Sequence, residues 1–157
     1  MRFHWITTIA LAAVLSFASQ SVAEEQEKKI DRSNLPPAVE KTVAAQSQAA
    51  TIRGFSEETE NGQKLYEVKL MLDGHKKNIL MDANGSIVEV EEQVAMESLS
   101  PAVRDGLQAK AGSGKLVKVE SITKNSKLVA YEARVMTNGK KSEVQVGPDG
   151  KPLDHEE

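Results

Sequence analysis

The sequence contains no cysteine. The chain can therefore form no disulfide, even in an oxidising compartment, and it offers no thiol nucleophile or thiolate metal ligand. It also has no residue that could carry the lipid of a bacterial lipoprotein. Aromatic residues are few, with one Trp, two Tyr and three Phe. An aromatic platform for stacking on sugars or bases is therefore not expected.

Basic residues are not in excess either. Lys and Arg number 20 against 23 Asp and Glu, which gives a net charge of −3 with both signs interspersed. Nucleic-acid binding needs a concentrated basic surface, so we exclude it. Histidine is scarce, and no Ser or His stands in a recognisable nucleophile or acid–base setting. We expect no catalytic residues, no dedicated metal site and no cofactor.

Residues 1–23 have the organisation of a secretory signal peptide. Arg2 provides the positive start, 6–18 form an apolar core, and small residues at 21–23 form a cleavage site. The apolar run is too short for a membrane span, which needs roughly 20 residues. We predict cleavage after Ala23, no membrane insertion of the released chain, and a periplasmic or secreted location.

Residues 24–34 follow as a strongly charged segment. Such a composition buries little apolar surface, and chain ends are commonly poorly ordered. We therefore predict a disordered leader over 24–34.

An internal repeat organises the rest of the chain. The sequence LPPAVEKTV, Leu35–Val43, returns as LSPAVRDGL, Leu99–Leu107. In both copies the apolar residues recur at i, i+4 and i+8, which is one stripe of a helix. The prolines suit a first helical turn, and Ser100 is a plausible N-cap. A short helix is expected at each of these positions.

The helices are followed by strand-like patterns that also repeat. LYEVKLMLDGHKK is matched by AYEARVMTNGKKS, and apolar residues alternate with period two in both. Asp73-Gly74 and Asn138-Gly139 are strong hairpin signals. We predict an α+β tandem duplication in which each repeat is a short helix packed on a four-stranded antiparallel sheet. Repeat 1 spans 35–92, a linker spans 93–98, and repeat 2 with an acidic tail spans 99–157.

The stretch ILMDANGSIVEV, Ile79–Val90, allows two interpretations. Asp82, Asn84 and Ser86 have the spacing of the first oxygen ligands of a calcium loop, but the Gly at position 6 and the Glu at position 12 are absent. A β-turn instead favours Asp at its first position and Gly at its fourth, which Asp82 and Gly85 provide. The turn is the better interpretation.

The sheet face opposite the predicted helices carries the candidate partner-binding residues. Period two places charges around a Met there in both repeats: Glu67, Lys69, Met71, Glu132, Arg134 and Met136. Methionine is adaptable and common on promiscuous binding surfaces, and an apolar residue ringed by charge suits a protein interface. The alternatives are an ordinary solvated sheet face, or Met packed against the sister repeat.

Binding of small ligands or metal ions in the envelope is the competing function. The lysine pairs 76–77 and 140–141 could bind anions, although Lys at strand edges also discourages edge-to-edge pairing. The acidic tail around His155 could hold a metal only weakly, because adjacent side chains of an extended tail point apart. Glu89, Glu91 and Glu92 we interpret as a solvated charged face rather than an acid–base pair.

The repeat as a whole resembles a known family. LPPAVEKTV, then YEVKLMLDG, then ILMDANGSIVEV is similar to the PepSY and PepSY-like domains and to the architecturally similar secreted β-lactamase inhibitor proteins. The resemblance implies a non-enzymatic envelope module that binds a protein partner and restrains a peptidase or another enzyme. The absence of Cys and the scarcity of aromatics depart from the β-lactamase inhibitors and argue against a β-lactamase as the target.

Overall fold

The computed structural model describes residues 27–60 and 62–157. Its strands form one antiparallel sheet whose eight strands follow one another in sequence order from β1 to β8. The strands are β1 Lys28–Ile30, β2 Thr51–Glu60, β3 Gln63–Leu72, β4 His75–Met81, β5 Ile87–Val94, β6 Lys115–Lys124, β7 Lys127–Thr137 and β8 Lys140–Val146. The helices are α1 Pro37–Gln46 and α2 Pro101–Ala111, with short 3-10 turns at Arg32–Asn34 and Met96–Ser98.

The predicted α+β fold, in which each of two repeats is a short helix packed on a four-stranded antiparallel sheet, is wrong. The described strands form a single eight-stranded antiparallel sheet, and the two helices are short. The sheet is continuous because β5 pairs along its second edge with β6, from Glu89 opposite Lys124 to Val94 opposite Val119. This pairing satisfies the backbone groups that an edge strand would leave open.

The tight turns between strands follow the sequence signals. Asp73 and Gly74 have φ angles of 49° and 83°, and Asn138 and Gly139 have 52° and 79°. Positive φ at both central residues is the requirement of a type I′ hairpin turn, which Asp-Gly and Asn-Gly meet most readily. Both predicted hairpins are confirmed.

The turn after β4 is also confirmed. The amide of Gly85 donates to the carbonyl of Asp82 at 2.9 Å, which closes a β-turn. The Asp82 side-chain Oδ1 accepts from the backbone amides of Asn84 and Ser86, each at 2.9 Å. The carboxylate is thus used inside the turn, as Asx-turn chemistry requires.

Each helix covers its own apolar cluster on the sheet. In α1 the stripe buries Val39 and Val43, and in α2 it buries Val103 and Leu107. The α2 N-cap is as expected, because the Ser100 hydroxyl accepts from the amide of Val103 at 3.2 Å. The three aromatic residues of the described chain belong to these helix-side clusters: Tyr66 and Phe55 to the first, Tyr131 to the second.

From residue 27, where the described chain begins, the charged segment differs from the disordered leader expected over 24–34. Residues 28–30 form β1, which pairs with β2. Lys28 lies 3.2 Å from a carboxylate oxygen of Glu57, and Glu27 lies 2.6 Å from Nζ of Lys69. Backbone pairing with β2 and these two ion pairs thus hold in place a segment that has little apolar surface. The predicted signal peptide, 1–23, and its cleavage site lie outside the described residues.

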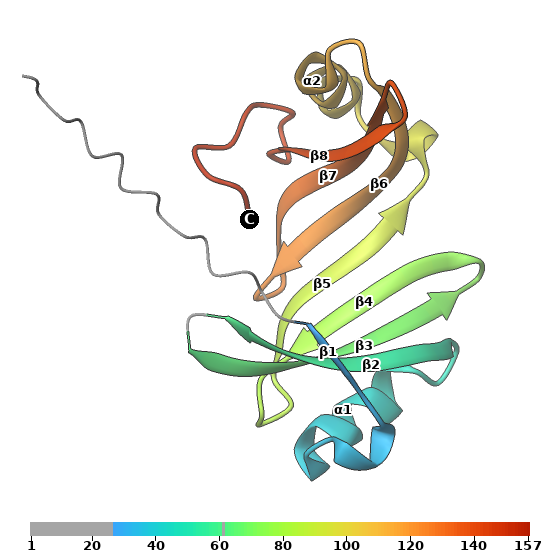
Figure 1. The fold of residues 1–157 in the computed structure, drawn as a ribbon, viewed down its shortest axis with the longest axis vertical. Coiled ribbons are helices and arrows are strands. Elements are labelled where there is room, and N and C mark those ends of the chain that lie inside the picture. Colours follow the sequence, from blue (N-terminus) through green and yellow to red (C-terminus); the bar gives the residue numbers. More distant parts are fainter. Residues whose placement is uncertain (1–26, 61) are drawn as a thin grey trace, which may run out of the picture.

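The sheet is strongly curved, and this curvature creates the candidate site. Figure 1 shows α1 and α2 at opposite ends of the molecule, on the outer side of the sheet. The inner side, between the β2–β4 end and the β6–β8 end, is lined by the sheet and by the C-terminal segment. No helix in residues 27–60 and 62–157 is long and apolar enough to cross a membrane.

Candidate functional site: an acidic hollow on the inner face

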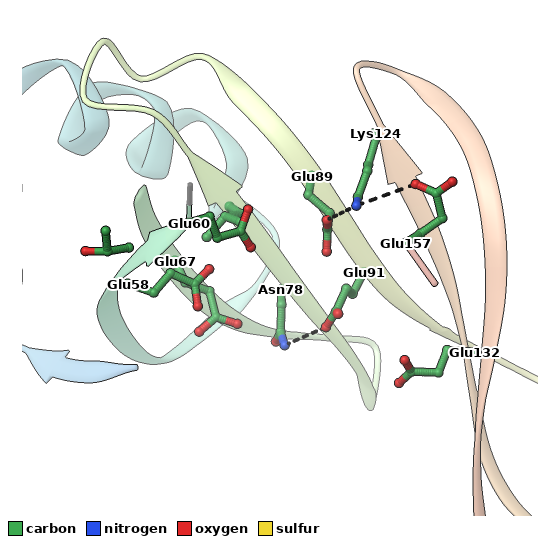
Figure 2. Close-up of a pocket in the computed structure, with 11 residues that line it drawn as sticks. Glu58, Glu60, Glu67, Asn78, Glu89, Glu91, Lys124, Glu132 and Glu157 are labelled. Carbon is green, nitrogen blue, oxygen red and sulfur yellow. Dashed lines mark hydrogen bonds and ion pairs between the residues drawn. The ribbon is translucent and has the colours of Figure 1, made fainter. Parts of the chain in front are cut away.

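The inner face holds a hollow of about 600 Å³. Figure 2 shows that its side chains come from both ends of the curved sheet and converge on the space between them. The lining residues are Glu58, Thr59, Glu60, Glu67, Asn78, Leu80, Glu89, Glu91, Lys124, Glu132 and Glu157. Seven of them are glutamates, and Lys124 is the one basic residue of this lining. The hollow is therefore strongly acidic.

Strand periodicity explains why these side chains point inward. In β3, Tyr66, Val68 and Leu70 face the helix-side core. Glu67 lies between them in sequence, so its side chain projects to the opposite face. Strand pairing places polar residues of neighbouring strands opposite one another on this face, with Ser56 opposite Glu67 and Asn78 opposite Glu91. Curvature brings the two ends of this polar face together.

Glu91 lies at the centre of the hollow. Its Oε2 accepts a hydrogen bond of 3.2 Å from Nδ2 of Asn78. Burial, together with the nearby carboxylates of Glu120, Glu89 and Glu132, raises the pKa of Glu91 to about 7. The neutral amide of Asn78 opposes this shift, but it does not offset removal from water and three like charges. Glu91 therefore changes its charge near neutral pH.

Glu132 lines the hollow from β7, two strands away from Glu91. Burial is the main cause that raises the pKa of its carboxyl above the usual range. Gln145 donates to its Oε2 at 2.9 Å, which stabilises the ionised form in part. Two carboxyls of the lining thus have raised pKa values, and shifted pKa values that gather in a concave site are typical of functional sites.

Lys124 joins two of the lining carboxylates. Its Nζ lies 3.5 Å from Glu89 and 3.6 Å from Glu157. Lys124, together with Lys69 at 3.2 Å from Glu67, does not neutralise seven carboxylates, so the hollow keeps an excess of negative charge. That charge is screened only partly in a concave, half-buried site.

The six predicted partner-binding residues all lie on the inner face, but the structure brings only some of them together. Glu67 and Glu132 line the hollow. The other four do not line it: Lys69 contacts Glu67 and Glu27, and Arg134 pairs with Glu143 at 2.9 Å. Met71 and Met136 are partly buried and lie near the hairpin ends of β3 and β7. Strands β4, β5 and β6 lie between β3, which carries residues 67, 69 and 71, and β7, which carries residues 132, 134 and 136.

The interpretation of Glu89, Glu91 and Glu92 as one solvated face is wrong for Glu89 and Glu91, which line the hollow. Period two correctly places these residues on one side of β5, but it does not reveal that this side is concave and faces further carboxylates. The one sequence signal is the alternation of Glu89 and Glu91 with Val88 and Val90. Glu157 carried no signal, because its place in the hollow depends on the path of the last segment.

The chemistry of the hollow favours binding of positive charge. Within the described residues, no group of three or more His, Cys, Asp or Glu is arranged to hold a metal ion. The lining contains no aromatic side chain for a sugar ring to stack on. Carboxylates held on two walls can instead accept hydrogen bonds from ammonium or guanidinium groups.

Comparison with protein-family models finds no match, and comparison with curated protein sequences finds none either. Solved structures are similar. A DUF2874 family protein from Bacteroides ovatus matches at 18% identity and a TM-score of 0.59, covering 76% of this chain and 85% of that one. A BLIP-like protein from Bacteroides fragilis matches at 21% identity and a TM-score of 0.54, covering 74% and 81%. The fold is BLIP-like.

A third structure supports the same fold. A proposed periplasmic protein from Bacteroides eggerthii matches at 14% identity and a TM-score of 0.61, covering 76% of this chain and 86% of that one. The β-lactamase-inhibitor-like part of the predicted resemblance is thus supported for the fold, whereas no comparison shows a PepSY domain.

Proposed function

We propose that this protein is a non-enzymatic binding module of the periplasm that docks a basic segment of a partner protein on the helix-free inner face. The acidic hollow supports the proposal. A Lys or Arg side chain entering it would meet carboxylates from β3, β5 and β7. Such complementarity provides orientation and rapid association, and desolvated charge pairs add affinity.

Other classes of ligand fit less well. Nucleic acid would be repelled by the carboxylates. A glycan would find no aromatic surface, because Phe55, Tyr66 and Tyr131 belong to the helix-side clusters. An extended basic polypeptide needs only an open, acidic, concave surface with polar groups for its backbone.

The six residues predicted from sequence fit this proposal in two roles. Glu67 and Glu132 contact the basic side chain within the hollow. The remaining four, Lys69, Met71, Arg134 and Met136, form a mixed rim on the same face. A polar rim around a central anchor is the usual anatomy of a protein interface.

The partner we propose is an enzyme of the cell envelope, with a peptidase as the first candidate. The resemblance described from the sequence supports this class, and the predicted signal peptide and the BLIP-like fold are consistent with it. Restraint of the enzyme would follow if its basic segment is held on the inner face and its substrate is thereby excluded.

Affinity capture from an envelope extract tests the proposal when matched variants serve as bait. The hollow variant carries Glu67→Gln, Glu91→Gln and Glu132→Gln. The control carries Asp31→Asn, Glu97→Gln and Asp105→Asn, which remove the same formal charge from exposed positions outside the hollow. We expect the original chain and the control to capture the same protein and the hollow variant to lose it. Equal capture by all three would reject the inner face as the docking surface.

A further inference from the structure

The last segment, 151–157, returns over the inner face, and its final residue lies in the hollow (Figures 1 and 2). The backbone amide of Glu157 donates to Oε1 of Gln145 at 2.8 Å, and Nε2 of Gln145 donates to the main-chain oxygen of Glu157 at 3.4 Å. The Glu157 carboxylate also lies 3.6 Å from Nζ of Lys124. Three polar contacts therefore join this residue to β8 and β6.

The contact with Gln145 is one that another polypeptide could make. Gln145 is 5% exposed, and its side chain lies on the inner face beside Glu132. A carboxamide presents a donor and an acceptor side by side, as a peptide group does, so it can pair with the main chain of any extended segment. In this structure the main chain of Glu157 takes that place.

The segment is fixed by packing at its start, whereas polar contacts hold its last residue. The Gly147 amide donates to the carbonyl of Lys151 at 2.8 Å, closing a turn. Gly150 in that turn packs against α2, where an added Cβ would lie 2.1 Å from the carbonyl oxygen of Ala102. Beyond Lys151, the intervening Asp154, His155 and Glu156 are exposed. The segment can therefore leave the hollow by pivoting after Lys151.

We infer that residues 153–157 are a displaceable internal occupant of the docking face, which a basic partner segment must replace. This regulation rests on the proposed function, because it concerns the same hollow. A tethered occupant reduces the apparent affinity of any competitor by the fraction of time that it fills the site. If that fraction is about four fifths, removing the occupant tightens partner binding roughly fivefold.

The segment is acidic, so the effect of its charge on the binding of a cationic peptide is opposite to the effect of its place in the hollow. Deletion of 153–157 removes Asp154, Glu156 and Glu157, so Coulomb attraction alone would make the shortened chain bind a cationic peptide more weakly. Tighter binding by the shortened chain can then arise only from vacating the hollow.

The experiment titrates a short fluorescein-labelled peptide of alternating Lys and Ala with three proteins at low ionic strength, read by fluorescence anisotropy. The proteins are the full chain, the chain lacking 153–157, and the full chain with Asp154→Asn and Glu156→Gln. The double substitution is the matched control, because these side chains lie outside the hollow lining. We expect roughly fivefold tighter binding after the deletion and equal or weaker binding for the control.

A second measurement on the full chain does not depend on how well the shortened chain folds. On titration with the same peptide, the amide resonance of Glu157 should move toward its position in the Gln145→Ala variant. An unmoved resonance at saturation, or a deletion that binds equally or more weakly, overturns the inference alone and leaves docking in the hollow intact. If the peptide binds neither chain, docking of basic segments fails, and the inference fails with it.

Discussion

Nδ2 of Asn78 lies 3.2 Å from Oε2 of Glu91, so a neutral amide donates to a carboxyl that burial and three neighbouring carboxylates keep from ionising easily. This contact contains no cation that would compensate the negative charge of the Glu91 carboxylate. The result is a group with a pKa of about 7 in the folded chain, against an ordinary value of 4.5. Ionisation of Glu91 therefore makes both the stability of the fold and the charge of the hollow depend on pH.

Glu91→Gln should stabilise the protein at high pH. Because the pKa is raised, the folded state still binds a proton at pH values where the unfolded chain has released it. The protonation of Glu91 therefore contributes its full stability below the ordinary pKa, and this contribution is lost as pH rises through about 7. The full difference corresponds to about 3 kcal/mol. Gln keeps the acceptor for Asn78 but never ionises. Urea unfolding should show a gain of this order at pH 8 and almost none at pH 4.5.

Glu97→Gln is the control for that experiment, because this exposed side chain lies outside the hollow. Its effect on the free energy of unfolding should stay within about 0.5 kcal/mol at either pH. A gain from Glu91→Gln that does not change with pH would contradict the role assigned to its ionisation.

Binding of a cationic peptide should weaken between pH 8 and pH 6. As pH falls through about 7, Glu91 gains a proton and the hollow loses negative charge. Fluorescence anisotropy with the Lys-Ala peptide measures this directly at constant ionic strength. In Glu91→Gln the pH dependence over this interval should largely disappear; its persistence would assign the titration to another group.

Gly85→Ala should be strongly destabilising. A Cβ at this position would lie 2.4 Å from the carbonyl oxygen of Ala38, and φ is +76°. Backbone strain and the clash with helix α1 together predict a loss of about 2 to 4 kcal/mol in urea unfolding. Gly74→Ala is the matched control, since its φ is +83° but no heavy atom lies within 4 Å. It should lose only about 1 to 2 kcal/mol. Equal losses would remove the packing part of the explanation.

Leu107→Ala should destabilise the second apolar cluster. Leu107 of α2 is fully buried against the sheet, so its truncation leaves a cavity among residues such as Val119 and Val146. Such changes cost about 2 to 5 kcal/mol. Val117, which is 48% exposed, provides the comparison. Val117→Ala should change the free energy of unfolding by no more than about 0.5 kcal/mol.

Local features of the fold were predictable from sequence, whereas the joining of its halves was not. The Asp73-Gly74 and Asn138-Gly139 turns follow from the φ angles that these residues tolerate. The pairing of β5 with β6 has no such signal, because α2 separates the two strands and the register depends on the whole sheet. This one pairing joins the strands of the two halves into a single curved sheet.

The candidate site was only partly predictable for a related reason. Alternation along β3 and β7 placed Glu67 and Glu132 on the face opposite the helices, and both line the hollow. Alternation says nothing of curvature, and curvature determines which inward side chains meet. The position of Glu91 among the other carboxylates therefore depends on the curvature of the sheet, which the sequence pattern does not reveal.

The most direct test of the account is peptide binding by the hollow variant that carries Glu67→Gln, Glu91→Gln and Glu132→Gln. Anisotropy titrations with the Lys-Ala peptide at pH 8 should show affinity reduced by about tenfold or more, since each lost charge contact contributes roughly 0.5 to 1 kcal/mol. The control with Asp31→Asn, Glu97→Gln and Asp105→Asn should bind as the original chain does. Equal loss in both variants would show that only net charge matters and would contradict docking in the hollow.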